Sequence, residues 1–335
     1  MPVDMSLFLQ NIDMTFSNQQ EQQTRFLLDY AINLARSGSC SPSLFPLDVS
    51  LGLHRGRIRE ENEDSVLAIG GTRPETQEVF GLFVVCDGMG GHAHGQEAAY
   101  LAIQTMLASV FPLLMDGTAS SPWESVLAES IQVANRAIHL RNQSREQQAA
   151  VRNIHGRRTV STSQIHRMGT TVTAALLFGE TVFIANVGDS RTYLYETQGL
   201  RRATKDHSVV ASLVEQGIIT EQDCYVHPER NKITRALGIG SSVEVDTFVV
   251  AFPAGAKLML CSDGMWEMTR DPSIEAILAS PWASASLMTN QLVQLALDGG
   301  GADNISCLLI QRQQADTSTL ETSVLDPVST VAEMQ

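Results

Sequence analysis

Short apolar runs of strand length, separated by glycine-containing turns, alternate with longer stretches of helical spacing between residues 51 and 312. The predicted strands are residues 65–69, 78–86, 170–178, 181–187, 191–195, 247–251, 257–261 and 305–311. The predicted helices are residues 96–111, 123–141, 209–216, 273–279 and 285–297. Strands 65–69 and 78–86 are expected to form a hairpin, and the three runs from 170 to 195 an antiparallel meander. Because strands come in groups and helices in pairs, the pattern predicts a layered α+β fold.

The segments outside this pattern divide the chain into parts. Residues 1–50 are expected to be an N-terminal extension with one amphipathic helix, since Leu27, Tyr30 and Leu34 follow a capping-box sequence at residues 17–20. That stripe favours packing on the main domain, with docking of a partner as the alternative. Residues 142–167 are polar without a sustained period and predict a surface loop or insertion, and residues 205–240 a small flap. The tail, residues 313–335, is expected to be disordered.

Composition narrows the partners and the compartment. The 335 residues carry a formal charge of −14, which argues against nucleic acid or an anionic membrane as the main partner. The longest apolar patch, residues 100–115, is interrupted by polar residues and falls short of a membrane span. With no secretory signal pattern and five cysteines without paired spacing, we expect a cytoplasmic protein with reduced thiols.

Four acidic positions stand where strands begin or end. Asp87 ends the apolar run 81–86 and is followed by a glycine-rich turn, and Asp263 ends the run 258–261 in the same way. Asp303 and Glu63 each lie just before a predicted strand. A single Asp-Gly after an apolar run most often marks a tight turn, but the repetition predicts one shared site.

Clustered carboxylates cannot all stay ionised at neutral pH without counter-charges, so the site is expected to hold cations. Carboxylates together with the Gly88 carbonyl favour Mg²⁺ or Mn²⁺ over Zn²⁺. Two such ions about 3.5–4 Å apart can support in-line attack of a shared water on phosphorus, without a protein nucleophile. Arg59 precedes Glu63 by four residues, which in an extended strand places both side chains on one face, and its guanidinium is suited to a phosphate.

Six motifs in this order resemble those of the type 2C metal-dependent serine/threonine protein phosphatases (the PPM family), in particular bacterial-type members. The matching segments are Arg59-x-x-Asn62-Glu63-Asp64, Asp87-Gly88-Met89-Gly90-Gly91-His92, Met168-Gly169-Thr170-Thr171, Asn186-Val187-Gly188-Asp189-Ser190-Arg191, Ser262-Asp263-Gly264 and Gly301-Ala302-Asp303-Asn304. The resemblance covers residues 51–312. It implies a four-layer α-β-β-α sandwich of two antiparallel sheets flanked by helix pairs, with a small flap.

The resemblance also assigns roles to these residues. It implies two Mn²⁺ or Mg²⁺ ions bridged by Asp87. Asp263 and Asp303 would complete one ion site, and Glu63 with the Gly88 carbonyl the other. Asp189 with Asp263 would match a third, weaker ion position. Arg59 would bind the substrate phosphate, and together with Asp87 it is assigned to catalysis. Asp64 and Asn304 would support the ligands. Met89 stands where many eukaryotic members have a histidine that donates a proton, which methionine cannot do. We therefore expect a water on an ion to act as the general acid, and His92 to support the site.

These observations predict hydrolysis of phosphoserine and phosphothreonine in phosphorylated proteins, as left by serine/threonine kinases, by a monomeric enzyme. The alternative is a catalytically silent relative that binds phosphopeptides or a regulatory partner, although such a relative would usually lack one of the metal-binding acids. Cys224 and Arg230 have the spacing of a cysteine-dependent phosphatase loop, but the bulky residues between them argue against that site.

Overall fold

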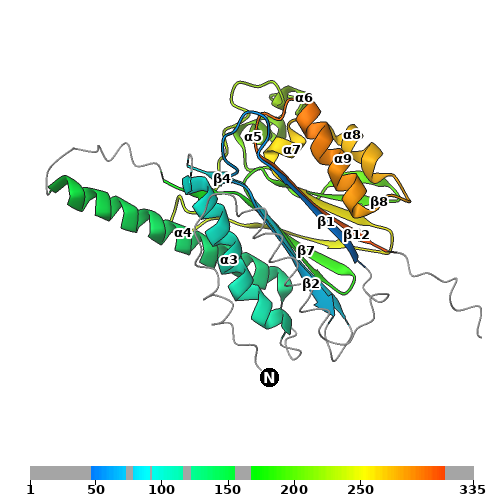
Figure 1. Cartoon of the computed structure of the whole chain (residues 1–335), viewed down its shortest axis with the longest axis horizontal. Helices are drawn as coiled ribbons and strands as arrows, with labels where there is room; N and C mark the ends of the chain where they lie inside the picture. The colour runs from blue at the N-terminus through cyan, green and yellow to red at the C-terminus, as the bar shows by residue number, and fades with distance from the viewer. Residues whose placement is uncertain (1–46, 73–77, 91–92, 116–121, 155–166, 314–335) are drawn as a thin grey trace, which may run out of the picture.

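The computed structural model describes residues 47–72, 78–90, 93–115, 122–154 and 167–313, which form two five-stranded antiparallel sheets with helices on both outer sides (Figure 1). The first sheet has the order β1 (Leu47–His54), β12 (Ile305–Arg312), β11 (Lys257–Cys261), β8 (Arg191–Glu196) and β9 (Gly199–Arg202). The second sheet has the order β10 (Asp246–Ala251), β7 (Thr181–Val187), β6 (Val172–Phe178), β3 (Val79–Cys86) and β2 (Ser65–Thr72). A two-stranded ladder pairs β4 (Gly88–Met89) with β5 (Gly169–Thr170).

Helices cover the outer face of each sheet. The pair α3 (Ala93–Met115) and α4 (Trp123–Ile154) packs on the second sheet, and α7 (Asp263–Trp266), α8 (Asp271–Leu278) and α9 (Ala285–Asp298) on the first. The short helices α5 (Val209–Glu215) and α6 (Glu221–Cys224) lie in the flap segment.

Three apolar cores separate the four layers, and the central strand β3 shows how the sequence builds them. Leu82 and Val84 point into the core under α3 and α4, whereas Phe83 and Val85 point into the core between the sheets. Because alternate side chains leave opposite faces of a strand, a strand covered on both sides needs an unbroken apolar run. The predicted α+β sandwich with flanking helix pairs is confirmed.

Helix α4 corrects the prediction of a loop at residues 142–167, because the helix continues to Ile154 and its far end runs out beyond the sheets (Figure 1). The prediction failed since residues 143–148 of this helix are all polar, and most of them exposed, so they form no apolar stripe. Residues 155–166 lie outside the described ranges.

Several boundaries and pairings also differ from the prediction. β1 begins at Leu47, so the proposed limit of the N-terminal extension at residue 50 cuts a strand. The helix expected in residues 1–50 and the tail from 314 lie outside the described residues. The meander is wrong in its last member: β6 and β7 pair, but β8 crosses to the other sheet and pairs with β11 and β9. The hairpin of β2 and β3 is confirmed.

Helix α3 is longer than the predicted helix, residues 96–111, and Pro112 lies within it. By length and composition alone, its residues His94–Leu114 could cross a membrane. Ala98, Ala102, Met106 and Val110, however, are completely buried in the core between α3, α4 and the second sheet. We therefore interpret α3 as a core helix.

Candidate metal centre

The predicted acidic residues from the two sheets meet at one end of the sandwich. Asp87 directly follows β3 of the second sheet, whereas Asp263 begins α7 after β11 and Asp303 lies just before β12, both in the first sheet. The charges of Asp263, Asp303 and Asp189 all act on the Asp87 carboxyl group. Side chains up to 216 positions apart in the sequence, Asp87 and Asp303, thus share one site.

The electrostatics of this cluster fit bound cations. Burial raises the pKa of Asp87 and of Asp189 well above the ordinary value, and neighbouring carboxylates raise both further. Burial also raises the pKa of Asp263, with the charge of Asp303 as the next cause. Among the side chains that the structure describes, Oδ1 of Asp263 is buried without a hydrogen-bond partner. Such an oxygen needs a positive ligand or a proton, and an all-oxygen donor set suits Mg²⁺ or Mn²⁺.

Within the described ranges, no three His, Cys, Asp or Glu side chains are already arranged as a complete ligand group. One contact bears on this arrangement, because Asp303 Oδ2 accepts a hydrogen bond from Arg59 Nη2 at 2.6 Å and part of its carboxylate is already engaged.

Glu63 and Gly88, predicted to hold the second ion, lie against each other. A Cβ on Gly88 would overlap the backbone oxygens of both Glu63 and Gly95. A Cβ on Gly95, in the first turns of α3, would overlap Glu63 Oε2 and lie 2.7 Å from the Gly88 carbonyl carbon. Gly95 is therefore the residue that leaves room for both predicted ligands, and the sequence analysis missed it. No signal in the sequence indicates it, because the predicted helix begins at residue 96 and Gly95 reads as part of the preceding turn.

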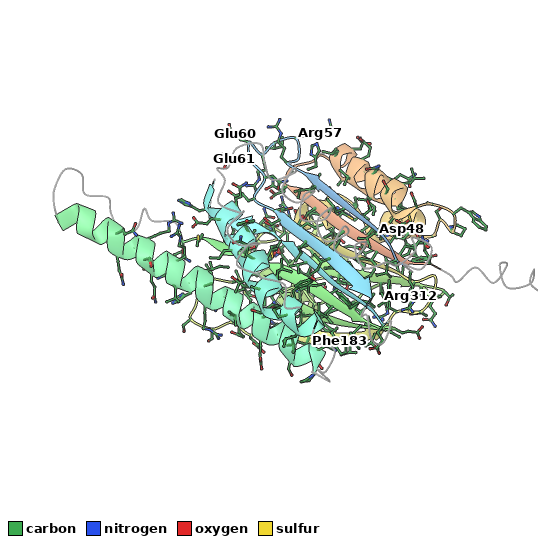
Figure 2. All side chains as sticks on the ribbon, turned by 60° about the horizontal axis from the view of Figure 1, so that its bottom comes forward. Asp48, Arg57, Glu60, Glu61, Phe183 and Arg312 are labelled. Carbon is green, nitrogen blue, oxygen red and sulfur yellow. The ribbon has the colours of Figure 1, made fainter. Side chains whose placement is uncertain are left out.

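Arg59 reaches the site from a turn, not from a strand. Residues 56–58 form a turn with Gly56 at φ 78°, and β1 ends at His54, so the expected extended strand carrying Arg59 and Glu63 on one face is wrong. The loop lies at the end of the sandwich opposite Asp48 and Arg312, with Arg57, Glu60 and Glu61 grouped there (Figure 2).

Arg59 keeps its charge in this position. Partial burial works against the charge, but Asp303 and then Asp263 and Glu63 outweigh it and raise the pKa of Arg59. Its side chain is 54% exposed, so the guanidinium is open to a ligand from solution.

Asn304 and Asp64 support the predicted ligands. Asn304 Oδ1 accepts from the Glu63 N–H at 2.8 Å, and Asn304 Nδ2 donates to the carbonyls of Arg55 and Glu61, so the Arg59 loop is tied to Asp303. Asp64 is fully buried, and its Oδ2 accepts from Ser262 Oγ at 2.8 Å, next to Asp263. Both residues thus contact segments that carry predicted ligands, and their supporting role stays a prediction.

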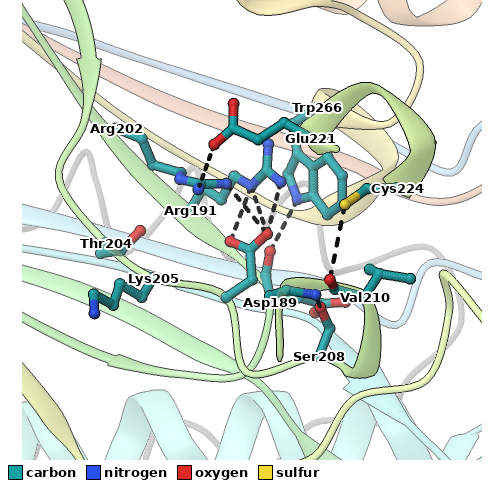
Figure 3. Close-up of polar contacts among 12 residues, drawn as sticks. Asp189, Arg191, Arg202, Thr204, Lys205, Ser208, Val210, Glu221, Cys224 and Trp266 are labelled. Carbon is teal, nitrogen blue, oxygen red and sulfur yellow. Dashed lines mark hydrogen bonds and ion pairs between the residues drawn. The ribbon is translucent and has the colours of Figure 1, made fainter. Parts of the chain in front are cut away.

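Asp189 lies in the turn between β7 and β8 and is fixed by aromatic and ionic contacts that the sequence did not reveal. Trp266 Nε1 donates to the Asp189 carbonyl at 2.9 Å, and the Arg191 guanidinium stacks 3.5 Å from the centre of the Trp266 ring (Figure 3). Arg191 Nη2 also pairs with Asp206 Oδ2 at 2.6 Å, and both side chains are buried. This turn is thus joined to α7, which begins with Asp263, and to the start of the flap.

The backbone that carries Asp87 is held by the segment 168–171. Thr171 N donates to the Asp87 carbonyl at 2.9 Å, and Asp87 N donates to Thr171 Oγ1 at 3.1 Å. Asn142 of α4 binds both the N–H and the carbonyl of Met168 through its amide, and donates to the Gly238 carbonyl at 3.1 Å. The amide therefore connects α4 to the metal site and to the end of the flap.

The remaining predicted residues give a mixed result. His92 lies outside the described residues, so its supporting role stays a prediction. Its neighbour His94 contacts Arg145 Nη2 through Nε2. Cys224 ends α6, and its Sγ lies 3.9 Å from the Val210 carbonyl in the flap, where burial raises the pKa of the thiol. A thiol with a raised pKa is a poor nucleophile, which agrees with the argument against a cysteine phosphatase loop.

Comparisons with known proteins agree with this geometry. A family model described as protein phosphatase 2C matches residues 60–296. A serine/threonine phosphatase, stp, of Listeria monocytogenes is 37% identical over 258 residues, which cover 77% of this chain and 93% of the relative. A serine/threonine protein phosphatase, PstP, of Mycobacterium tuberculosis is 33% identical over 255 residues, covering 76% of this chain and 43% of the relative.

Solved structures show the same fold. The crystal structure of the Mycobacterium tuberculosis phosphatase PstP/Ppp has a TM-score of 0.63 and 31% identity, covering 80% of this chain and 99% of the other. A PstP catalytic domain in complex with two manganese ions has a TM-score of 0.60 and 30% identity, with coverages of 80% and 99%.

Proposed function

The chain belongs to the protein phosphatase 2C family, and from this premise we propose that it is a metal-dependent phosphatase that removes phosphate from phosphoserine and phosphothreonine in proteins. The observation that carries the proposal is the meeting of buried acids from both sheets, Asp87, Asp263 and Asp303, beside the exposed guanidinium of Arg59. Burying several carboxylates together costs folding free energy when no cation is bound, so the presence of such a cluster indicates a functional site.

Each residue has a task that follows from its position. Asp87, between the two sheets, would contact two Mn²⁺ or Mg²⁺ ions, with Asp263 and Asp303 on one side and Glu63 with the Gly88 carbonyl on the other. When bound, these ions supply an activated water and positive charge at the phosphoryl group. Asp189 is available to a third ion next to Asp263, whose charge acts on it.

Arg59 binds and orients the phosphate. Its pairing with Asp303 engages one nitrogen, and the planar fork carries five N–H donors, so it can hold Asp303 and a phosphate oxygen together. Met89, beside Gly88, cannot give a proton to the leaving oxygen, so this chain's own residues offer no imidazole at that position. We therefore propose that the proton comes from water.

The test is metal-dependent turnover in matched variants. Wild type, Asp87→Asn and Asp263→Asn are assayed with p-nitrophenyl phosphate and a phosphothreonine peptide at increasing Mn²⁺, with circular dichroism to verify folding. Wild type should turn over both substrates only with Mn²⁺ or Mg²⁺, and both variants should lose activity by about 100-fold or more while remaining folded. Cys224→Ser should retain wild-type activity.

A folded wild-type protein that binds the phosphopeptide without metal-dependent turnover would instead support the silent phosphopeptide-binding relative. We further propose that the enzyme is a monomer, that it is cytoplasmic, and that in signalling it removes phosphate added by serine/threonine kinases. Size-exclusion chromatography with light scattering tests the monomer, and cell fractionation tests the cytoplasmic location.

A further inference from the structure

A small apolar surface lies directly beside the metal centre. The side chains of Met89 and Ile239 both approach Gly169: a Cβ on Gly169 would lie 3.3 Å from Met89 Cγ and 3.2 Å from Ile239 Cδ1. We call these three residues the Met89–Ile239 platform. Since a Cβ at residue 169 would contact both side chains this closely, the glycine allows them to converge.

The platform is continuous with the candidate metal centre through the β4–β5 ladder. Met89 pairs with Gly169, and Gly88, the predicted carbonyl ligand, pairs with Thr170. Thr170 in turn bridges to Leu237, two residues before Ile239. An apolar surface on this ladder therefore begins one residue from the atoms expected to hold an ion.

Ile239 is 45% exposed, although the backbone on both sides of it is held by hydrogen bonds. On either side of it, Asn135 Oδ1 accepts from the Gly238 N–H at 2.8 Å and Asn135 Nδ2 donates to the Gly240 carbonyl at 3.1 Å. Asn135 is completely buried on α4. An apolar side chain held in water on an ordered backbone is a preorganised contact, because little conformational freedom is lost when it binds.

We propose that the platform binds an apolar side chain that flanks the phosphorylated residue of the substrate, so that the enzyme favours phosphoserine or phosphothreonine next to a residue such as leucine. The proposal rests on the phosphatase function proposed above. An extended peptide places neighbouring residues about 3.4 Å apart, so with the phosphate at the metal centre the next one or two residues reach the platform. The side chains of Met89 and Ile239 carry no hydrogen-bond donor. They therefore provide contact area for an apolar flanking side chain, but no hydrogen-bond donor for a polar one.

The experiment compares peptides that differ in one flanking residue. Phosphothreonine peptides with leucine or serine immediately before, or immediately after, the phosphothreonine are assayed for kcat/KM with the Mn²⁺-loaded, full-length protein. We expect wild type to favour leucine by about three- to tenfold on at least one side, the effect of partly burying one apolar side chain. Ile239→Ser should reduce that ratio to about one. Ile239→Val should retain it, and Leu287→Ser should leave it unchanged because Leu287, 51% exposed, lies on α9 outside the opposite sheet.

Hydrolysis of p-nitrophenyl phosphate has no flanking residue, so its kcat/KM should be the same in wild type and in Ile239→Ser. Equal rates for the leucine and serine peptides in wild type, or a preference that survives in Ile239→Ser, would overturn the proposal. If wild type hydrolyses nothing, the proposed function fails, and anisotropy of the labelled peptides with wild type and Ile239→Ser tests the platform separately. If Ile239→Ser unfolds, Ile239→Ala replaces it.

Discussion

Gly95→Ala is the sharpest test of the metal centre, because it adds one methyl group at a helical position. In an ordinary helix interior this change stabilises the fold by about 1 kcal/mol. Here the new Cβ would lie 2.7 Å from the Gly88 carbonyl carbon and 2.8 Å from Glu63 Cδ. Carbon atoms in contact prefer about 3.5–4.0 Å, so the two predicted ligands of one ion must move apart by about 1 Å.

The size of the effect follows from the narrow tolerance of metal sites. Ligand distances vary by only about 0.2 Å, and a misplacement of about 1 Å can lower turnover about 100-fold. We therefore expect kcat/KM at fixed Mn²⁺ to fall about 100-fold in Gly95→Ala. A 100-fold weaker Mn²⁺ site loses about 2.7 kcal/mol of the stabilisation given by saturating metal, which corresponds to a Tm shift of about 5–10 °C.

The assay measures Tm and kcat/KM across a Mn²⁺ titration for wild type, Gly95→Ala and Gln96→Ala, the next position of α3. Without metal, all three proteins should unfold at similar temperatures, because the helical gain of Gly95→Ala offsets the added contact. With Mn²⁺, wild type and Gln96→Ala should gain stability, and Gly95→Ala much less. An unchanged Mn²⁺ dependence in Gly95→Ala would show that Glu63 and Gly88 do not hold an ion together.

Two further changes test how the site is supported. Asn142→Leu leaves the buried N–H and carbonyl of Met168 without their amide partner. We therefore expect the free energy of unfolding in urea to fall by about 2–5 kcal/mol, and the enzyme to require more Mn²⁺. Unchanged values would mean that α4 does not support the Asp87 segment. Asp246→Asn tests the contacts of Asp246, the first residue of β10, with His207 and Arg235 of the flap segment. Burial works to raise the pKa of Asp246, but His207 and Arg235 outweigh it and lower that pKa. Because the folded-state pKa is lowered, the ionised Asp246 stabilises the fold at pH values above the unfolded pKa of about 4. Wild type should therefore exceed the variant in urea stability at pH 7, and the difference should shrink as the pH falls below about 4 and vanish only below the lowered folded-state pKa. A difference that persists at low pH would assign the effect to packing.

The acids of the candidate metal centre could be singled out in the sequence because their signal is local. Asp87 and Asp263 each end an apolar run before a glycine, and a buried strand that stops at a carboxylate is visible without knowledge of its neighbours. The same holds for the central strand β3. Its continuous apolar run requires cover on both faces, which predicts a layered sandwich.

Contacts between distant segments could not be predicted in this way. Nothing in the sequence around Trp266 indicates that its indole binds the Asp189 carbonyl, since that bond depends on how α7 meets the turn after β7. The crossing of β8 to the other sheet was missed because the short turn 188–190 also suits a hairpin. Arg59 was expected on an extended strand because its spacing of four residues from Glu63 would place both side chains on one face. The turn at Gly56 became visible only with its positive φ.

The position of the acids at the seam between the sheets has a consequence for folding kinetics. Asp87 comes from one sheet, and Asp263 and Asp303 come from the other, so a partly folded chain with only one sheet formed cannot assemble the full ligand set. Divalent ions should then bind only after the two sheets have docked, and they should be released only when the two sheets separate. Mn²⁺ is therefore expected to slow unfolding and to leave the refolding rate almost unchanged.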